Sequence, residues 1–421
     1  MRLLYVVRLF SGLEDGLRKS VWQPRGVPTI YRMIEALDRS DHDVRFVFTC
    51  KDVGSGWEHS GHRTFSVEGL RNPVTVLAGG NRLPRMLGRA RGYLREGRQA
   101  WPLWRLHRAF KPDLMYFDRV NIYQAALAAR FTDTPVVWRV MGVPPAMHDM
   151  LELENPIARV TRVAYRSPFA QVICSRDGSG GEAWMERALA ASTPRAMMIN
   201  GAEDPPDASL SSDIAAVLPD DRTKILFVAR LVENKGCEAF MDGFLKALDA
   251  CPDKLHAVIA GDGPFAEPMK AAARERDALD CVSFLGQLPH DQIAALHRAC
   301  DIYVSLNPMG NLTNANLEAL KCGACMIIPA AQPDSGIDAD TQELVPEDVA
   351  VRVSSPQDAA GLASALVRLH RDPGERGARS KRAKQVAASL IPSWDERIKN
   401  EIRLLDRVVG EKQPNHFIGA A

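Results

Sequence analysis

Several features that would place this chain of 421 residues in a specialised class are missing from its sequence. No apolar run approaches the roughly 20 residues needed to cross a bilayer. The charges nearly balance, with 53 Lys plus Arg against 52 Asp plus Glu, which argues against a dedicated nucleic-acid binder. Repeats and low-complexity segments are also lacking. The composition is that of a globular protein, and the length favours two domains.

The sequence also offers little evidence for a cysteine-based site or for a signal peptide. Of the eight cysteines, only Cys322 and Cys325 stand at a spacing known from metal and redox sites, and no second ligand pair accompanies them. We therefore expect no metal site. The opening segment Met1–Arg8 resembles a signal peptide only superficially, because Arg8 interrupts its apolar stretch and no cleavage site follows. It is interpreted as the first buried strand of a cytoplasmic protein.

What the sequence does contain is a regular alternation of short apolar runs and amphipathic stretches. The runs predicted as buried strands are Leu3–Val7, Val44–Phe48, Leu114–Phe117, Val136–Val140, Val172–Cys174, Ile225–Val228, Ala257–Ala260, Val282–Leu285, Ile302–Leu306 and Met326–Pro329. The predicted helices include Thr29–Leu37, Glu238–Leu248, Phe265–Arg276 and Asp291–Ala299. This alternation indicates parallel sheets with helices on both faces. A Pro- and Ser-rich segment, 205–213, separates two groups of strands, so we predict two doubly wound α/β domains facing each other across a cleft.

Three segments of the second half combine strand ends with residues suited to binding a phosphate. Arg230 and Lys235 follow a buried strand, and two cations there can clamp a pyrophosphate. The alternative is a pair of solvated loop charges. Ala260-Gly-Asp-Gly-Pro264 is a tight turn after the next strand, where glycine lets a ligand approach the backbone.

The third segment is the loop rich in Gly and Asn after Leu306, which leads into a helix that starts near Thr313. Exposed amides and the helix dipole at such a start favour an anion. Glu318 lies inside this helix, where its carboxylate can accept hydrogen bonds from a ribose diol. The alternative is an ordinary helix glutamate.

In their order and spacing these segments resemble the nucleotide-sugar domain of the family 4 retaining glycosyltransferases, which have the GT-B fold. The resemblance is carried by "ARL…NKG", "AGDGP", "FLGQLPHDQIAALHRACDIYVSLN" and "NANLEALKCGACMII", and it is strong over 195–405. Met198-Ile-Asn-Gly201 resembles the motif before the interdomain linker, and Ser393–Leu405 the terminal helix that crosses back. The resemblance implies domains over 1–204, completed by 393–415, and over 214–392.

The resemblance also implies roles for individual residues on the donor side. Arg230 and Lys235 would bind the donor pyrophosphate and stabilise the leaving nucleoside diphosphate, and Glu318 would hold the ribose. The family's first glutamate, eight positions before Glu318, is replaced here by Gly310. Asn311, Thr313 and Asn314 are expected to offer neutral contacts instead. The residues placed at the donor are Gly261, Gly263, Gly310, Asn311, Leu312, Thr313, Asn314 and Glu318.

On the acceptor side the sequence departs from the family pattern. The usual glycine pair after the first strand is missing, and Gly26 is the nearest candidate. Many relatives carry His-Gly at the end of the Val136–Val140 strand, where this chain has Met141 and Gly142.

A strongly basic segment stands out between residues 82 and 111. It holds nine basic residues and one acidic residue, Glu96, around an apolar stripe that includes Trp101 and Trp104. Such a stripe with basic flanks is typical of a helix in an anionic membrane interface, and Pro102 is expected to break this helix. The cations assigned to the membrane are Arg89, Arg91, Arg95 and Arg98. Alternatively, the stripe packs on the sheet and the arginines are solvated; nucleic-acid binding is a third interpretation.

These observations predict a retaining glycosyltransferase without metal or other cofactor, with a nucleoside-diphosphate sugar as co-substrate. The expected acceptor is a glycan or lipid-linked hydroxyl in cell-envelope or polysaccharide biosynthesis. The expected location is the cytoplasm, with peripheral attachment to the inner face of the membrane. Two alternatives remain open, a nucleotide-sugar epimerase of the same fold and an inactive GT-B binding protein.

Overall fold

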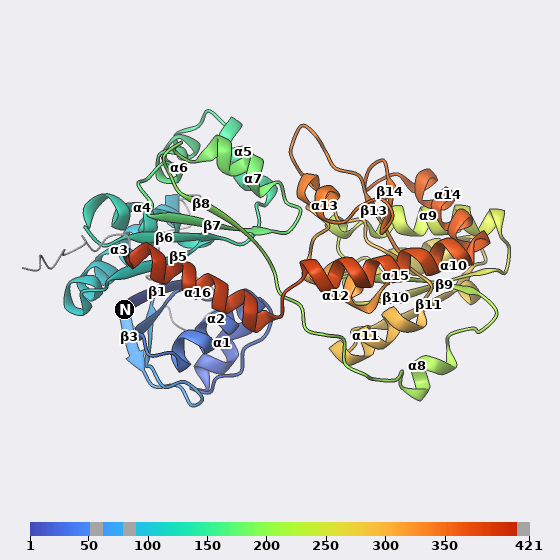
Figure 1. The fold of residues 1–421 in the computed structure, drawn as a ribbon, viewed down its shortest axis with the longest axis horizontal. Coiled ribbons are helices and arrows are strands. Elements are labelled where there is room, and N and C mark those ends of the chain that lie inside the picture. The colour runs from blue at the N-terminus through green and yellow to red at the C-terminus, as the bar shows by residue number, and fades with distance from the viewer. Residues whose placement is uncertain (51–61, 79–89, 411–421) are drawn as a thin grey trace, which may run out of the picture. The chain divides into compact units, whose positions relative to one another are not determined.

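The computed structural model of this protein describes residues 1–50, 62–78 and 90–410, with side chains except at 62 and 90–95. It forms two compact α/β units (Figure 1). The first consists of Met1–Ser175, Trp184–Met198 and the chain from Glu396, and the second of Arg176–Ala183 and Ile199–Asp395. The chain therefore passes into the second unit before residues 205–213, and the short segment 176–183 belongs to that unit too.

The first unit contains an eight-stranded sheet in the order β3-β4-β2-β1-β5-β6-β7-β8. Its strands are β1 (Arg2–Arg8), β2 (Asp43–Thr49), β3 (His62–Phe65), β4 (Val74–Leu77), β5 (Leu114–Asp118), β6 (Val136–Val140), β7 (Gln171–Arg176) and β8 (Arg195–Ile199). The six strands from β4 to β7 in this order pair in parallel, and β3 is antiparallel to β4. Hydrophobic clusters cover the sheet on both faces, which is why β5 and β6 are buried throughout.

Helices connect the strands of the first unit. They are α1 (Ser11–Arg18), α2 (Pro28–Arg39), α3 (Ala90–Phe110), η2 (Arg119–Asn121), α4 (Ile122–Phe131), α5 (Pro145–Glu152), α6 (Pro156–Tyr165), α7 (Gly181–Ala188) and α16 (Trp394–Gly410). Helix α16 closes the unit from the C-terminal end of the chain, and its residues Ile398 and Leu405 are buried in the core beside β1 and β2. This return of the last helix was expected.

The second unit contains a six-stranded, entirely parallel sheet in the order β11-β10-β9-β12-β13-β14. Its strands are β9 (Thr223–Val228), β10 (Leu255–Ala260), β11 (Val282–Gly286), β12 (Ile302–Val304), β13 (Met326–Pro329) and β14 (Ala350–Val353). Its helices are α8 (Ser212–Ala216), η3 (Glu233–Lys235), α9 (Cys237–Ala250), α10 (Ala266–Glu275), η4 (Leu279–Cys281), α11 (His290–Ala299), α12 (Asn314–Cys322), α13 (Ala339–Leu344), α14 (Ala359–Arg371) and α15 (Pro373–Leu390).

All ten predicted strands and all four named helices are present, but one prediction about a helix was wrong. Pro102 does not break α3, which continues from Ala90 to Phe110. Leu103 and Phe110, on the C-terminal side of the proline, are both buried in the core. This packing offsets the amide hydrogen bond that a proline cannot donate. No helix in the described parts of the chain is long and apolar enough to span a membrane.

Candidate functional site

The strand order of the second unit determines where a ligand is expected to bind. The chain runs outward from β9 through β10 to β11 and then returns to the other side of β9 with β12. Open parallel sheets bind ligands at the carboxyl ends of the strands where the order reverses, here between β9 and β12. The Arg230–Lys235 segment follows β9, and the loop rich in Gly and Asn follows β12. Two of the three predicted segments therefore meet at this point.

Two cations extend from the loop after β9. Arg230 is exposed, and Lys235 is half-buried at the end of η3. Burial and then the nearby charge of Arg230 lower the pKa of Lys235 below its ordinary value. Neither side chain has an ion-pair partner in the part of the chain that the structure describes. Two neighbouring cations without a carboxylate are unfavourable unless an anion binds between them, so this loop is suited to a pyrophosphate.

The glycine turn after β10 packs directly on the cation loop. The amide of Leu231 donates to the carbonyl of Asp262 over 2.9 Å, and the amide of Phe265 donates to the carbonyl of Leu231 over 2.9 Å. A Cβ on Gly261 would lie 1.8 Å from the Ala229 carbonyl oxygen, so a larger residue does not fit. Gly261 and Gly263 thus fix the loop that carries Arg230, and this packing role differs from the direct donor contact expected of them.

The loop after β12 is held by a buried network of amide side chains. Asn311 donates two hydrogen bonds to the carboxylate of Asp338. Its backbone amide donates over 2.6 Å and its side-chain amide over 2.8 Å. Asn316 donates to the Asn311 carbonyl and accepts from the hydroxyl of Tyr303, each over 2.8 Å. The Leu312 amide donates to the Asp177 carbonyl. Asn311 and Leu312 are buried and bonded internally, so they shape the loop. Their contact with a donor stays a prediction.

Gly310 has a geometric reason to be a glycine. Its φ is +116°, and a Cβ at this position would lie 2.4 Å from the carbonyl carbon of Gly178. The backbone of the 176–183 segment therefore fills the space into which a side chain at position 310 would extend. The close approach of this segment therefore accounts for a glycine where the family pattern has a glutamate. The sequence analysis did not connect the segment with the loop.

The start of α12 faces the same strand ends. Thr313 is its N-cap, and the Thr313 hydroxyl accepts from the amide of Asn316. The first amides of a helix have no partners within the helix, so they are available to an anion. Asn314 accepts a 2.9 Å hydrogen bond from Asn200, a residue of the Met198–Gly201 motif whose contact was not predicted.

Glu318 lies one turn further along α12 and is partly buried. Its side chain is 27% exposed, and burial raises the pKa of this carboxyl above its ordinary value. The charge of His290 opposes that shift, because the His290 Nδ1 lies 3.8 Å from a Glu318 carboxylate oxygen. His290, at the first position of α11, is a neighbour that the sequence analysis did not single out. The carboxylate is open enough to accept from a diol, and its burial makes such a bond stronger.

The residues expected on the acceptor side lie in the first unit at the carboxyl edge of its sheet. Met141 and Gly142 follow β6, and the Arg119 guanidinium donates to the Gly142 carbonyl over 2.9 Å. Gly26 is exposed in the loop before α2, with Phe10 of the β1 loop beside it. Phe10, Arg119 and the Met141–Gly142 pair follow the neighbouring strands β1, β5 and β6, and Gly26 precedes α2. Arg119 is a further cation at this edge that the sequence analysis missed.

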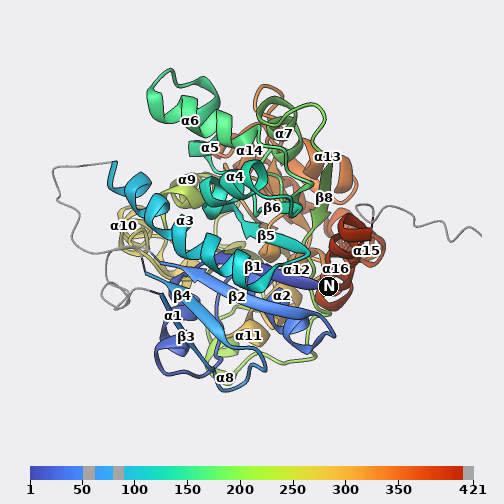
Figure 2. The same ribbon diagram turned by 90° about the vertical axis from the view of Figure 1, so that its left-hand side faces the viewer.

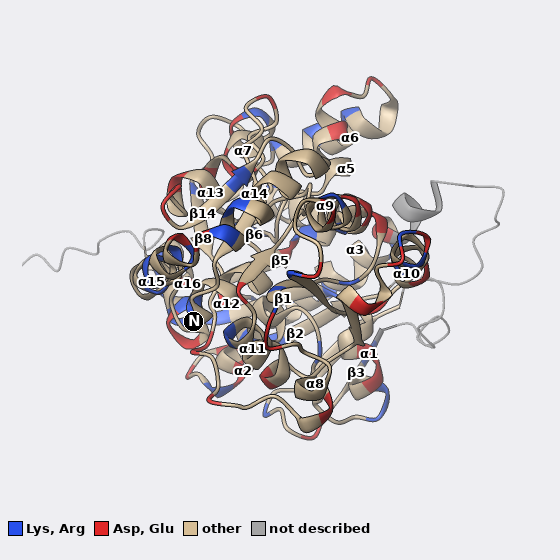
Figure 3. Ribbon diagram, turned by 90° about the vertical axis from the view of Figure 1, so that its right-hand side faces the viewer, with Lys and Arg blue, Asp and Glu red and all other residues tan. Residues whose placement is uncertain are grey.

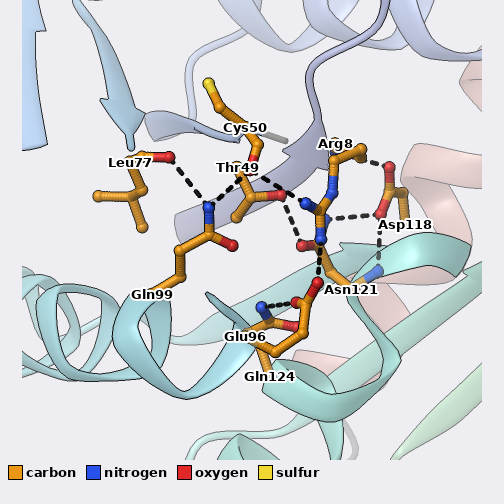
Figure 4. A network of polar contacts seen from close by, with 9 residues as sticks. All are labelled: Arg8, Thr49, Cys50, Leu77, Glu96, Gln99, Asp118, Asn121 and Gln124. Atoms are coloured by element: carbon orange, nitrogen blue, oxygen red, sulfur yellow. Dashed lines mark hydrogen bonds and ion pairs between the residues drawn. The ribbon is translucent and has the colours of Figure 1, made fainter. Parts of the chain in front are cut away.

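A buried polar network ties the β1 and β5 ends to α3 (Figure 4). The Arg8 guanidinium donates to Glu96 over 2.7 Å and to the Cys50 carbonyl over 3.2 Å, and the Arg8 amide donates to Asp118 over 2.7 Å. Gln99 donates to the carbonyls of Cys50 and Leu77. Glu96 thus points into the unit and fixes the rotation of α3, so the opposite face of this helix is directed outward.

The rotation of α3 determines which of the predicted membrane residues are exposed. Trp101 is 61% exposed, Trp104 is half-buried and Arg98 is exposed. Arg89 lies outside the described residues, and Arg91 and Arg95 belong to α3 without described side chains. Leu103 packs in the core. The helix therefore has both a core face and an exposed aromatic side.

The comparisons with known proteins bear first on the second unit. Residues 212–386 match the family model described as glycosyl transferases group 1. The match lies within the second α/β unit. The cation loop, the glycine turn and the α12 start all lie inside the matched range.

Curated relatives match parts of the chain. Alpha-monoglucosyldiacylglycerol synthase of Streptococcus pneumoniae is 27% identical over 110 residues, which are 26% of this chain and 25% of that protein. The 2-deoxystreptamine N-acetyl-D-glucosaminyltransferase of Streptomyces fradiae is 27% identical over 238 residues, 52% of this chain and 55% of that protein. The chain thus spans between a quarter and about half the length of these two glycosyltransferases.

Solved structures show the fold of the whole chain. HepE of Anabaena, solved in complex with UDP, covers 97% of this chain and 100% of its own, with a TM-score of 0.64 and 16% identity. Such a likeness at low identity shows the architecture alone. The chain has the GT-B fold, and the match to the group 1 glycosyltransferase model lies in its second α/β unit.

Proposed function

We propose that this protein is a retaining glycosyltransferase of family 4 that transfers a sugar from a nucleoside-diphosphate donor to an acceptor hydroxyl. The observation that carries the proposal is the pair Arg230 and Lys235, which lacks a carboxylate partner among the described residues and follows β9 where the strand order reverses. A diphosphate leaving group develops negative charge as the sugar departs. Two fixed cations beside the α12 start stabilise that charge.

The remaining roles follow from the same geometry. Glu318 accepts from the ribose diol of the donor, and the first amides of α12 bind the phosphates. Because the two cations already supply the positive field, we propose that the reaction needs no divalent metal. The leaving phosphate takes the proton of the acceptor hydroxyl as the new glycosidic bond forms on the face from which the diphosphate leaves. UDP is the first nucleoside diphosphate to test, since HepE was solved with it.

The acceptor is proposed as a glycan or lipid-linked hydroxyl at the inner face of the cytoplasmic membrane. One relative is named for a glucosyl-diacylglycerol and the other for 2-deoxystreptamine, so both a lipid and a soluble acceptor have precedent among similar proteins. The basic, Trp-bearing helix α3 favours the lipid.

A panel of UDP-, GDP-, ADP- and dTDP-sugars tests the proposal. Each donor is incubated with the protein, with and without EDTA, and the released nucleoside diphosphate and the anomeric configuration of the product are determined. We expect slow hydrolysis of one donor, unaffected by EDTA, with retention at the anomeric carbon. Conversion of the donor to its epimer without diphosphate release would instead identify an epimerase, and binding without turnover of any donor would indicate an inactive binding protein.

A further inference from the structure

An exposed apolar groove lies between two helices of the first unit. Helices α3 and α4 pack side by side on one face of the sheet, as Figure 2 shows. A pocket of about 330 Å³ between them is lined mainly by apolar atoms, and its lining residues include Trp101, Trp104, Leu127, Ala128 and Phe131. Phe131 is 75% exposed and Trp101 61% exposed. Large apolar side chains gathered in one exposed groove are uncommon on a surface that meets only water.

The two tryptophans of the groove are arranged as an aromatic pair. The rings of Trp101 and Trp104 stack with their centroids 5.2 Å apart, and the Arg108 guanidinium lies 4.3 Å from the Trp104 centroid. An indole combines an apolar body with an N–H donor, so it is stable at the level of lipid headgroups, and a neighbouring cation reaches the phosphates there.

The charge around the groove has one sign on α3. Arg98, Arg105, Arg108 and Lys111 are exposed along the described part of this helix and just after it. The single carboxylate of the segment, Glu96, is buried against Arg8 and Gln124 and adds nothing to the exposed face. By contrast, helices α9 and α10 of the second unit carry Lys or Arg interspersed with Asp and Glu (Figure 3).

We propose that the groove between α3 and α4 is a docking surface for an anionic lipid bilayer. Trp101 and Phe131 enter the boundary between headgroups and acyl chains, and Arg98, Arg105, Arg108 and Lys111 contact anionic headgroups. The exposed cations favour an anionic occupant, and the aromatic groove requires that this occupant also offer an apolar layer. A bilayer surface meets both requirements. The inference concerns where the protein binds, so it goes beyond the proposed transfer reaction and does not depend on it.

The surface overlaps only partly with the one that the sequence suggested. The sequence assigned Arg89, Arg91, Arg95, Arg98, Trp101 and Trp104 to the membrane, whereas the described groove combines the later part of α3, including both tryptophans, with α4. Leu127 and Phe131 of α4 could not be assigned to it from sequence, because the two helices are separated by strand β5.

Flotation with vesicles tests the proposal on the full chain. We expect the protein to float with vesicles that mix phosphatidylcholine and phosphatidylglycerol, to stay free with pure phosphatidylcholine, and to be released by high salt. The double variant Trp101→Ala, Phe131→Ser and the triple variant Arg98→Glu, Arg105→Glu, Arg108→Glu should each bind the mixed vesicles at least tenfold more weakly. All these side chains are exposed, so thermal unfolding should stay near that of the wild type.

Two matched controls make the outcome specific. The first control, Leu279→Ser, removes an exposed apolar side chain of the second unit. The second control is a triple variant, Arg371→Glu, Lys381→Glu, Lys399→Glu, which changes the net charge as much as the triple variant of the groove does. Both controls should bind mixed vesicles like the wild type. If the wild type ignores both kinds of vesicle, or if the groove variants bind as well as it does, the docking surface is refuted. Binding of nucleoside diphosphate, measured on the same samples, shows separately whether the proposed function holds.

Discussion

At the scale of single residues, Gly310 is where the chain departs most clearly from the family pattern. Restoring the glutamate by Gly310→Glu should not raise turnover. The new Cβ would collide with the Gly178 backbone at 2.4 Å, and φ is +116°. We expect a lower unfolding midpoint and lower donor hydrolysis. The control Gly377→Glu, on the exposed side of α15 with nothing within 4 Å of its Cβ, should leave both unchanged. A more active Gly310→Glu protein would show that the segment 176–183 yields to the side chain.

His297 gives a residue-scale prediction about pH. Burial, and then the charge of His290, lowers the pKa of this imidazole to about 4, and neither ring nitrogen has a hydrogen-bond partner among the described residues. The unfolded chain binds this proton near the ordinary pKa of about 6.5, so stability is lost as pH falls from there toward the folded value.

The loss assigned to His297 between about pH 7.5 and about pH 5 is roughly 2 kcal/mol. Urea unfolding of His297→Leu should therefore depend less steeply on pH than that of the wild type. Part of the slope should persist, because the pKa of buried His256 is also lowered to about 4. Equal slopes for the two proteins would contradict the assignment.

At the scale of elements, α16 is attached to the first unit by a buried ionic cluster. Glu401 accepts from Tyr116 and pairs with Arg139 and Arg397. Burial alone would raise the pKa of this carboxyl, but the two cations hold it below its ordinary value. Its contribution to stability is therefore present at neutral pH and is lost as the solution becomes acidic enough to protonate it.

Glu401→Gln would leave Arg139 and Arg397 buried with less compensation. We expect this variant to lose about 3–5 kcal/mol of unfolding free energy in urea denaturation. Asp395→Asn, an exposed change in the first turn of the same helix, should cost far less. Similar losses in both variants would mean that the cluster does not anchor α16.

The strands that the sequence analysis missed either are short or lie at the edge of a sheet. β3, β8 and β14 are outermost strands of their sheets, and β3, β4 and β14 have only four residues each. An edge strand is covered less completely and needs no continuous apolar run, so β8 is only half-buried throughout. Pro102 was misjudged for a related reason, since tertiary burial of Leu103 outweighs the local preference of a proline.

At the scale of the whole molecule, the positions of the main strands were predictable because fully buried parallel strands are continuous apolar runs. The three segments of the candidate site were predictable because each follows such a strand. The contacts that hold these segments in place were not predictable. Gly178 contacts Gly310 and Asn200 contacts Asn314, and each pair is more than a hundred positions apart in the sequence. Only the folded chain brings these pairs together.

Calorimetric titration with UDP and with uridine tests the central claim, that Arg230 and Lys235 bind a diphosphate while Glu318 holds the ribose. Lys235→Ala and Arg230→Ala should each weaken UDP binding at least roughly tenfold and leave uridine binding unchanged, because only UDP carries phosphates. Glu318→Gln should weaken both ligands, and Lys246→Ala, an exposed α9 lysine paired with Asp242, neither. If UDP does not bind, the same titrations are made with GDP, ADP or dTDP and the corresponding nucleoside in place of UDP and uridine. Equal affinities of the wild type and the Lys235 and Arg230 variants for the diphosphate would contradict the account.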